Sequence, residues 1–278
     1  MSLAHLCRLF GVSRQSVYQT EQREVQRQNE LSRVKPLVQK RRSEMPRLGT
    51  RKLHYLLKEK FAEEGLKIGR DALFEFLRGE QMLIRPKKNY TKTTNSKHWL
   101  KKHPNLLKEF KVTRAEEVFV SDITYLKSEE RTHYLTLVTD AYSRKIMGYC
   151  VSDDLSAENT TKALKMAIKH RLSKKSLIHH SDRGLQFASA VYQEELQRND
   201  IKPSMTDGYD CYQNALAERV NGILKGEFLI YHCQTKKDLE LLVKESIKTY
   251  NQKRPHLSLG MKTPEDVHKK ACGLPSTG

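Results

Sequence analysis

Three acidic residues, Asp122, Asp182 and Glu218, stand where a carboxylate could carry out chemistry. Asp122 lies within the β-rich run Val-Phe-Val-Ser-Asp-Ile-Thr-Tyr-Leu. A charge in such a run is costly unless it is paired or bound to a metal ion. Strand alternation places it on one face with Val118 and Val120, which favours a site. The alternative is an aspartate that points to water from an edge strand.

Asp182 follows a short apolar run in the segment Leu-Ile-His-His-Ser-Asp-Arg-Gly. In open α/β sheets, ligands bind beyond the carboxyl ends of the strands. The position therefore suits a functional side chain. A turn aspartate before Gly184 explains the residue alone equally well.

Glu218 lies on a predicted helix over residues 214–228. At about 100° per residue, one side of this helix is polar and the other apolar. The polar side carries Asn214, Glu218, Asn221, Gly222 and Lys225, and the apolar side carries Leu216, Val220 and Ile223. A solvent-exposed face explains Glu218 and Lys225, whereas Asn221 and Gly222 are poor helix formers for a plain surface. The polar side therefore also fits close approach to a ligand.

Three carboxylates without accompanying cysteines suit hard cations such as Mg²⁺ or Mn²⁺. Two such ions about 4 Å apart can activate a hydroxyl and stabilise a leaving oxygen in an in-line phosphoryl displacement. Lys225, two turns beyond Glu218, would then reach a phosphate on a DNA strand. Asn221 is a further candidate for DNA contact on the same side of the helix.

The elements that position these residues begin at about residue 116. Three strands with short turns are followed by alternating helices and strands, which predicts an α/β fold with a mixed sheet and helices on both faces. The predicted strands span residues 118–126, 134–139, 145–151, 177–180 and 201–205. The predicted helices span residues 156–170, 187–198, 214–228 and 239–252.

The region before this core is predicted to be all-α. Residues 2–20 have the pattern of a helix-turn-helix, with Gly11 in the turn and Ser13 as the cap of the second helix. A polar helix over residues 21–44, interrupted near Pro36, and a second helical unit over residues 46–84 follow. The candidate DNA contacts in this region are Arg14, Gln15, Arg47 and Arg51. An ordinary helical hairpin with a solvated basic surface is the alternative.

A basic connector links the two parts, with aromatic residues between its lysines. This composition suits a segment that lies along DNA, and a plain linker fits nearly as well. The candidate contacts here are Lys87, Lys88, Lys101 and Lys102. His98 and His103 lack a cysteine pair at ligand spacing, which argues against a zinc site.

Charge and composition point to a nucleic-acid partner. The net charge is +18 over 278 residues. Residues 1–115 hold 27 Lys+Arg and 11 Asp+Glu, which leaves 24 and 22 for the remainder. The basic excess therefore belongs to the N-terminal part, where it would attract phosphate backbones.

No apolar run is long enough for a membrane span, and no signal peptide is evident. Five scattered cysteines fit a reducing cytoplasm.

The ordered motifs resemble the OrfB-type catalytic chain of transposases of the insertion-sequence-three group, relatives of retroviral integrases. The 35 residues between Asp182 and Glu218 match the typical spacing of that family. The resemblance covers roughly residues 1 to 265. The matching segments are Ser121 to Tyr125, His180 to Gly184, Asn214 to Glu218 with Lys225, Tyr250 to His256 with Asn251, Arg254 and Pro255, and Thr263-Pro264.

The resemblance implies an RNase H-like core in which Asp122, Asp182 and Glu218 are the catalytic metal ligands. It implies a DNA transposase that cleaves the 3′ end of an insertion sequence and transfers the strand, in copy-out, paste-in movement through a circular intermediate. Implied partners are double-stranded DNA with terminal inverted repeats, target DNA and further copies of the chain. Arg254 and His256 of the tail motif become candidate DNA contacts. A cytoplasmic, nucleoid-associated protein is expected.

The resemblance also sets domain boundaries. We expect a helix-turn-helix and polar helix at 1–44, a second DNA-binding module at 45–84, a basic linker at 85–115, the catalytic core at 116–262 and a tail at 263–278. Two details depart from the family pattern: Gln213 replaces the more frequent aspartate before Asn214, and the loop Thr206–Tyr212 is unusual. The group often makes a longer fusion in which an upstream frame adds another helix-turn-helix and a zipper-like helix. Three alternatives therefore stay open: one frame with an upstream-frame partner, the catalytic half of a fusion, or a stand-alone form.

Two rival functions remain open from the residues alone. The first is an RNase H-like nuclease or junction resolvase, which hydrolyses without joining. The tail motif speaks for the transposase, because a simple nuclease has no evident need of it. The second is a non-catalytic DNA-binding regulator whose carboxylates are structural.

Overall fold

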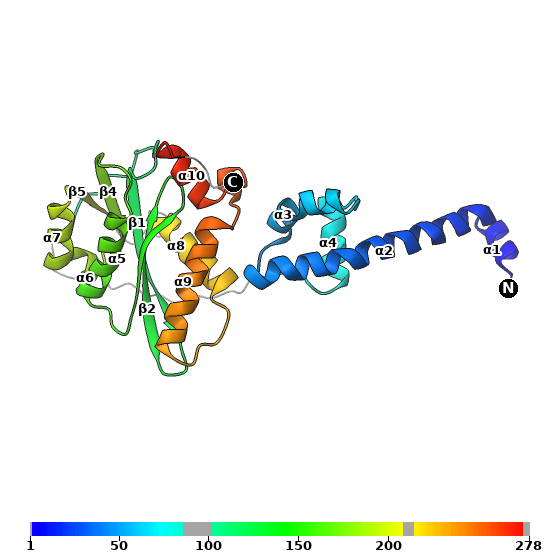
Figure 1. Cartoon of the computed structure of the whole chain (residues 1–278), viewed down its shortest axis with the longest axis horizontal. Coiled ribbons are helices and arrows are strands. Elements are labelled where there is room, and N and C mark those ends of the chain that lie inside the picture. Colours follow the sequence, from blue (N-terminus) through cyan, green and yellow to red (C-terminus); the bar gives the residue numbers. More distant parts are fainter. Residues whose placement is uncertain (1, 86–101, 208–213, 275–278) are drawn as a thin grey trace. The chain divides into compact units, whose positions relative to one another are not determined.

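The computed structural model describes residues 2–85, 102–207 and 214–274. The chain divides into two units, Met1–Arg85 and Pro86–Gly278 (Figure 1). The first unit is helical, and the second contains the sheet. Within the described residues, every helix is too short or too polar to cross a lipid bilayer.

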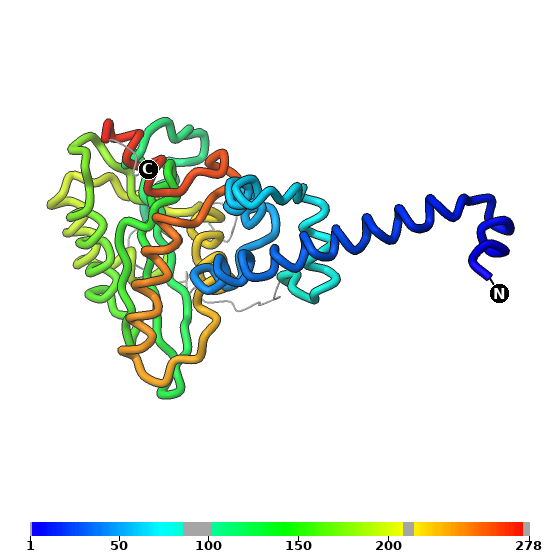
Figure 2. Tube along the Cα trace, turned by 45° about the vertical axis from the view of Figure 1, so that its right-hand side comes forward, coloured from blue at the N-terminus to red at the C-terminus, as the bar shows by residue number. Residues whose placement is uncertain are grey.

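The first unit is organised around one long helix (Figure 2). Helix α1 (Leu3–Leu9) is followed by a turn in which Gly11 has φ +66°, and helix α2 spans Arg14–Glu44. The Ser13 side chain accepts a hydrogen bond from the Ser16 amide at 3.0 Å. The predicted turn glycine and helix cap are therefore confirmed.

The predicted break near Pro36 is wrong, because α2 continues through this residue. Proline removes one backbone hydrogen bond and disfavours a helix interior, so tertiary contacts must hold the helix on both sides. Val34 and Val38 are fully buried, and Lys35 pairs with Glu80 at 2.6 Å. The packing of these residues outweighs the local preference.

Two shorter helices complete this unit, in the stretch where the sequence predicts a second helical module. Helix α3 spans Thr50–Glu63 and helix α4 spans Arg70–Gly79. Each buries one apolar side, as the helical spacing of their leucines predicts. Their buried apolar residues are Leu53, Leu57, Phe61, Leu73 and Leu77.

The second unit is built on a five-stranded sheet in the order β3-β2-β1-β4-β5. Strand β1 pairs with β2 antiparallel and with β4 parallel, and β3 and β5 form the edges. The strands are β1 (Val118–Lys127), β2 (Thr132–Asp140), β3 (Ile146–Ser152), β4 (Leu177–Ser181) and β5 (Ile201–Met205). Because β1 is the central strand, the edge-strand alternative for Asp122 is excluded.

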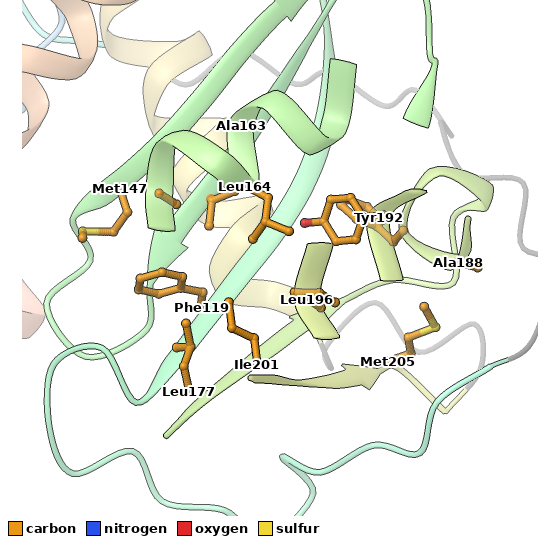
Figure 3. Packing of buried hydrophobic residues seen from close by; sticks show 13 residues of the cluster. Phe119, Met147, Ala163, Leu164, Leu177, Ala188, Tyr192, Leu196, Ile201 and Met205 are labelled. Carbon is orange, nitrogen blue, oxygen red and sulfur yellow. The ribbon is translucent and has the colours of Figure 1, made fainter. Parts of the chain in front are cut away.

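Helices cover both faces of the sheet (Figure 1). One face packs on α5 and α7, and this core contains Phe119, Leu164 and Tyr192 (Figure 3). The other face, with Val118 and Val120, packs on the helix that carries Ala217. The helices are α5 (Ala157–Lys169), α6 (Leu185–Ala188), α7 (Ala190–Arg198), α8 (Ala215–Ile223), α9 (Lys236–Gln252) and α10 (Pro264–Ala271), with a π-helix at Leu224–Phe228 and a 3₁₀ turn at Leu257–Leu259.

The predicted helix over 187–198 is divided in the structure. Ser189 has an extended backbone, and its side chain caps α7 by accepting a hydrogen bond from the Tyr192 amide.

Gly148 on β3 lies so close to α5 that an added Cβ would clash with the Ala163 carbonyl oxygen. A glycine is therefore required where α5 crosses this strand.

Two segments outside the predicted core boundaries pack on the sheet. Between residues 102 and 115, which we expected to be linker, the Leu106 amide donates to Ser204 Oγ at 2.9 Å. In the expected tail, α10 places His268 at full burial, with Nε2 3.2 Å from Glu116 Oε1 and Nδ1 3.6 Å from Asp140 Oδ2. Both segments thus contribute to the folded unit, a role that their polar composition does not indicate.

Candidate active site

Asp122 lies on the central strand β1, on the face shared with Val118 and Val120, as strand alternation predicts. Its Oδ2 accepts a hydrogen bond from Asn221 Nδ2 at 2.8 Å. Burial, and then the negative charge of Asp182, raises the pKa of Asp122 to about 7, while the Asn221 hydrogen bond acts in the opposite direction. The carboxyl group is held in a region of excess negative charge.

Asp182 follows β4 directly, at the same end of the sheet as Asp122. Ser121 and Ser181 are register partners on the parallel strands β1 and β4, so each aspartate comes one residue after a paired position. Asp182 Oδ1 also accepts from the Gly184 amide at 3.0 Å. The turn role that the sequence left open is therefore present together with proximity to Asp122.

Glu218 lies in the first turn of α8, and its side chain is exposed. Partial loss of solvent around the carboxyl group, followed by the negative charge of Asp182, raises the pKa of Glu218. Glu218 in turn contributes to the raised pKa of Asp122. Each of these three acidic residues thus influences another, which brings Asp122, Asp182 and Glu218 together in one electrostatic cluster.

Two asparagines attach α8 to β1. Asn214 Nδ2 donates to the Ser121 carbonyl oxygen at 3.0 Å, and Asn221 Nδ2 donates to Asp122. Both asparagines are buried, so this part of the polar side is not a solvent-exposed face. Part of the polar side faces the sheet, because the sheet offers polar partners there. Glu218 lies between the two asparagines along the helix.

Lys225 lies just beyond α8, in the π-helix Leu224–Phe228. Its Nζ donates to Thr124 Oγ1 at 3.1 Å, which places the ammonium two residues along β1 from Asp122. Burial lowers the pKa of Lys225, and the charge of Asp122 partly opposes this shift. Lys225 thus lies near Asp122, and its contact with a DNA phosphate stays a prediction.

Comparison with known proteins identifies the family. The integrase core domain family matches residues 112–211, and a second family of the same description matches residues 199–264. The insertion element IS600 uncharacterized 31 kDa protein of Shigella sonnei is 33% identical over 277 residues, covering 95% of this chain and 98% of the relative. Transposase InsF for insertion sequence IS3A of Escherichia coli (strain K12) is 31% identical over 197 residues, covering 70% of this chain and 68% of InsF. This chain belongs to the IS3 family of transposases.

The IS3-family transposase is accordingly a DDE enzyme, a polynucleotidyl transferase with an integrase-type core. A chain of the simian T-cell lymphotropic virus intasome, solved with the PP2A regulatory subunit B56 gamma, aligns with a TM-score of 0.52 and 18% identity. The alignment covers 83% of the transposase and 78% of that chain. The predicted RNase H-like α/β fold with an N-terminal helical region is confirmed.

The structure corrects the expected DNA contacts of Arg254 and His256 in the transposase. Arg254 is 2% exposed and forms two hydrogen bonds with Glu227, and His256 is 5% exposed and packs edge-on against Tyr250. Neither side chain is available to a phosphate in this structure. Spacing alone does not distinguish a buried arginine from one that reads DNA.

The remaining expected DNA contacts of the transposase have different surroundings. Arg47 donates to the Arg85 carbonyl oxygen and is half-buried. Exposed side chains that fit a contact with DNA are Arg14, Gln15, Arg51 and Lys102. Lys87, Lys88 and Lys101 lie outside the described residues. Contact with DNA by any of these residues stays a prediction.

Sequence reasoning missed a buried polar network behind Asp122. His179 Nε2 lies 2.7 Å from Ser121 Oγ and 2.8 Å from Tyr192 Oη. Burial lowers the pKa of His179 to about 3, so the ring is neutral. The network links β1, β4 and α7 directly beside the candidate site. A histidine within an apolar strand was the available signal, but its partners lie far away in the sequence.

Proposed function

We propose that Asp122, Asp182 and Glu218 of this transposase are the catalytic residues and bind two Mg²⁺ or Mn²⁺ ions. Asp122 and Glu218 support the proposal: burial raises the pKa of each carboxyl group, and the charge of Asp182 raises it further, a repulsion that a bound divalent cation would relieve. Carboxylate oxygens are also the ligands that these hard cations prefer. Bound there, the ions would supply Lewis-acid activation of the attacking and leaving oxygens.

The residues of the chain have distinct tasks in this proposal. Asn221 fixes one oxygen of Asp122 by its hydrogen bond, which orients the carboxylate. Asn214 and Asn221 together hold α8, so that Glu218 stays opposite the ends of β1 and β4. Lys225 exchanges its contact with Thr124 for a DNA phosphate and thereby positions the strand.

The proposed reaction is cleavage at the 3′ end of an insertion sequence followed by strand transfer. In the first step water attacks the phosphodiester and releases a 3′-hydroxyl. In the second step that hydroxyl attacks a target phosphodiester, and the bond to the target 3′-oxygen breaks. We propose that the family relationship extends to copy-out, paste-in movement through a circular intermediate.

The proposed partners are terminal inverted repeats, target DNA, further copies of this chain and an upstream-frame protein or fusion segment. The basic N-terminal part, with 27 Lys+Arg against 11 Asp+Glu in residues 1–115, supports DNA as a partner. Exposed Arg14 and Gln15 at the start of α2 would contact DNA. We place the protein in the cytoplasm at the nucleoid, where its DNA substrates lie.

Nicking of a supercoiled plasmid that carries the ends of the insertion sequence tests the proposed site. The wild-type protein should nick the plasmid only when Mn²⁺ or Mg²⁺ is present, and Asp122→Asn should lose this activity while retaining DNA binding. Asp200→Asn is the matched control, because Asp200 is exposed in a turn at φ +55°, which asparagine tolerates. Undiminished nicking by Asp122→Asn would refute the proposal.

Calorimetric titration with Mn²⁺ separates the site from a non-catalytic role. Wild-type protein should bind two ions, and Asp122→Asn and Glu218→Gln should each bind more weakly. Glu194→Gln, an exposed glutamate on α7, should bind as wild type does. Equal Mn²⁺ binding by all variants would favour a regulator whose carboxylates are structural.

A further inference from the structure

Four polar side chains of the segment Tyr250–His256 at the end of α9 are buried, although the sequence of the segment suggested contact with DNA. Tyr250, Asn251, Arg254 and His256 are each at most 8% exposed. Four polar side chains within seven residues are rarely buried without a purpose, because each needs a partner. Their partners reveal what the segment holds in place.

The first half of the segment is attached to the sheet. Asn251 Oδ1 accepts from the Ile146 amide at 2.9 Å, and Asn251 Nδ2 donates to the Ile146 carbonyl at 3.0 Å. Tyr250 Oη donates to the Arg144 carbonyl at 3.1 Å. Since both backbone groups of a β3 residue are engaged, the end of α9 has a fixed position relative to the sheet.

The second half of the segment reaches from this base to the end of α8. Arg254 Nη2 donates to Glu227 Oε1 at 2.6 Å, and Arg254 Nε donates to Glu227 Oε2 at 2.8 Å. The guanidinium carbon lies 5.8 Å from the centre of the Tyr250 ring. Two parallel hydrogen bonds to one carboxylate fix direction as well as distance, which a lysine at this position could not do.

Glu227 belongs to the π-helix Leu224–Phe228, the same wide turn that carries Lys225. The turn is closed by the Leu229 amide, which donates to the Leu224 carbonyl at 2.8 Å. Turns of this kind are rare and occur frequently at functional sites. Since Lys225 contacts Thr124 on β1, the conformation of this turn determines where the ammonium lies relative to Asp122.

We propose that Arg254 is a positioning residue for Lys225. Its paired hydrogen bonds to Glu227 hold the wide turn after α8, and through this turn they direct the Lys225 ammonium to the site on β1. The buried side chains of Tyr250, Asn251, Arg254 and His256 thus brace the active site from inside the protein and do not contact DNA. This proposal rests on the proposed role of Lys225 at the site.

A double-mutant cycle on plasmid nicking distinguishes positioning from general stability. Arg254→Lys keeps the charge but loses the paired hydrogen bonds, and we expect nicking to slow about 10- to 100-fold, the range for a misplaced active-site group. In a Lys225→Ala background the same substitution should slow nicking no further. Equal fold losses in both backgrounds would overturn the proposal.

Glu265→Gln is the matched control for loss of a partly buried ion pair. Lys145 and Glu265 are 2.9 Å apart, with side chains 16% and 14% exposed. Neither residue belongs to α8, the wide turn or the segment Tyr250–His256. Any fold change in nicking that Glu265→Gln causes should be the same in the wild-type background and in the Lys225→Ala background.

Amide hydrogen exchange tests the brace without DNA or metal. Arg254→Lys and Glu227→Gln should each accelerate exchange about ten-fold or more over residues 224–230, while the helix α9 keeps its wild-type rate. Glu265→Gln should leave residues 224–230 unchanged. Unchanged exchange there in Arg254→Lys and Glu227→Gln would overturn the brace. If Asp122→Asn nicks normally, the proposed function fails, whereas the exchange result still decides the brace.

Discussion

Replacing Asp122 by asparagine should stabilise the metal-free protein at alkaline pH, although the same change should abolish catalysis. In the folded chain, burial and then the charge of Asp182 raise the pKa of Asp122 from 3.8 to about 7. The folded state therefore holds this proton more tightly than the unfolded state does. Stability must consequently fall as the pH rises from the unfolded pKa through the folded pKa. Asparagine carries no charge, so the variant does not lose this stability as the pH rises.

The size of this gain follows from the shift. A change from 3.8 to about 7 is about 3 pKa units, and at 1.36 kcal/mol for each unit the upper limit is about 4 kcal/mol. The residue Asp122 as a whole is only half-buried, and its protonation is coupled to the charges of Asp182 and Glu218. Solvent screening and this coupling reduce the expected gain to about 1–3 kcal/mol.

Urea unfolding in EDTA, followed by far-ultraviolet circular dichroism, measures the effect. Asp122→Asn should exceed wild type in unfolding free energy at about pH 8, with a smaller excess at about pH 5. Asp200→Asn should match wild type at both pH values. Adding Mn²⁺ should stabilise wild type and leave Asp122→Asn nearly unchanged. An Asp122→Asn protein that is less stable than wild type at about pH 8 would rule out a charge at Asp122 that destabilises the metal-free fold.

Three further predictions concern the surroundings of the site. Asn221→Ala removes a hydrogen bond to Asp122 and should move the pH dependence of Mn²⁺ binding upward by about one unit, measured by calorimetric titration against Asn199→Ala. Gly148→Ala should cost about 1–3 kcal/mol in urea unfolding, because α5 must move away from β3; no loss would contradict the close approach. Burial lowers the pKa of His268, but its contacts with Asp140 and Glu116 raise it more. The stability that protonation adds is therefore complete below about pH 6.5 and is lost as the pH rises through the raised pKa, and His268→Gln should lack this decline in urea unfolding above about pH 6.5.

The sheet and its order of elements follow from local pattern in this protein. Alternation along β1 correctly placed Asp122 on the same face as Val118 and Val120, because every second side chain of a strand points to the same face of the sheet. Ser13 and Gly11 correctly marked the helix cap and turn, since their signals act over a few residues. Local chemistry was sufficient where the relevant partners lie within one element.

Features that depend on distant partners could not be predicted. The continuity of α2 through Pro36 depends on burial of Val34 and Val38 against other helices. Asn221 was interpreted as a residue that approaches a ligand or DNA, but its partner in the structure is Asp122, 99 positions away in the chain. Arg254 looked like a DNA contact for the same reason: its partner Glu227 is not evident from the motif.

The central claim is that Asp122, Asp182 and Glu218 form a metal site that joins DNA strands as well as cutting them. A strand-transfer assay tests it most directly. The protein is incubated with Mg²⁺, a supercoiled plasmid and a labelled duplex, and the duplex carries the pre-cut end sequences that flank the coding region. Labelled plasmid should form with wild-type protein and should not form with Asp122→Asn, Asp182→Asn or Glu218→Gln. Cleavage of the duplex without any labelled plasmid, or joining that survives in these variants, would contradict it.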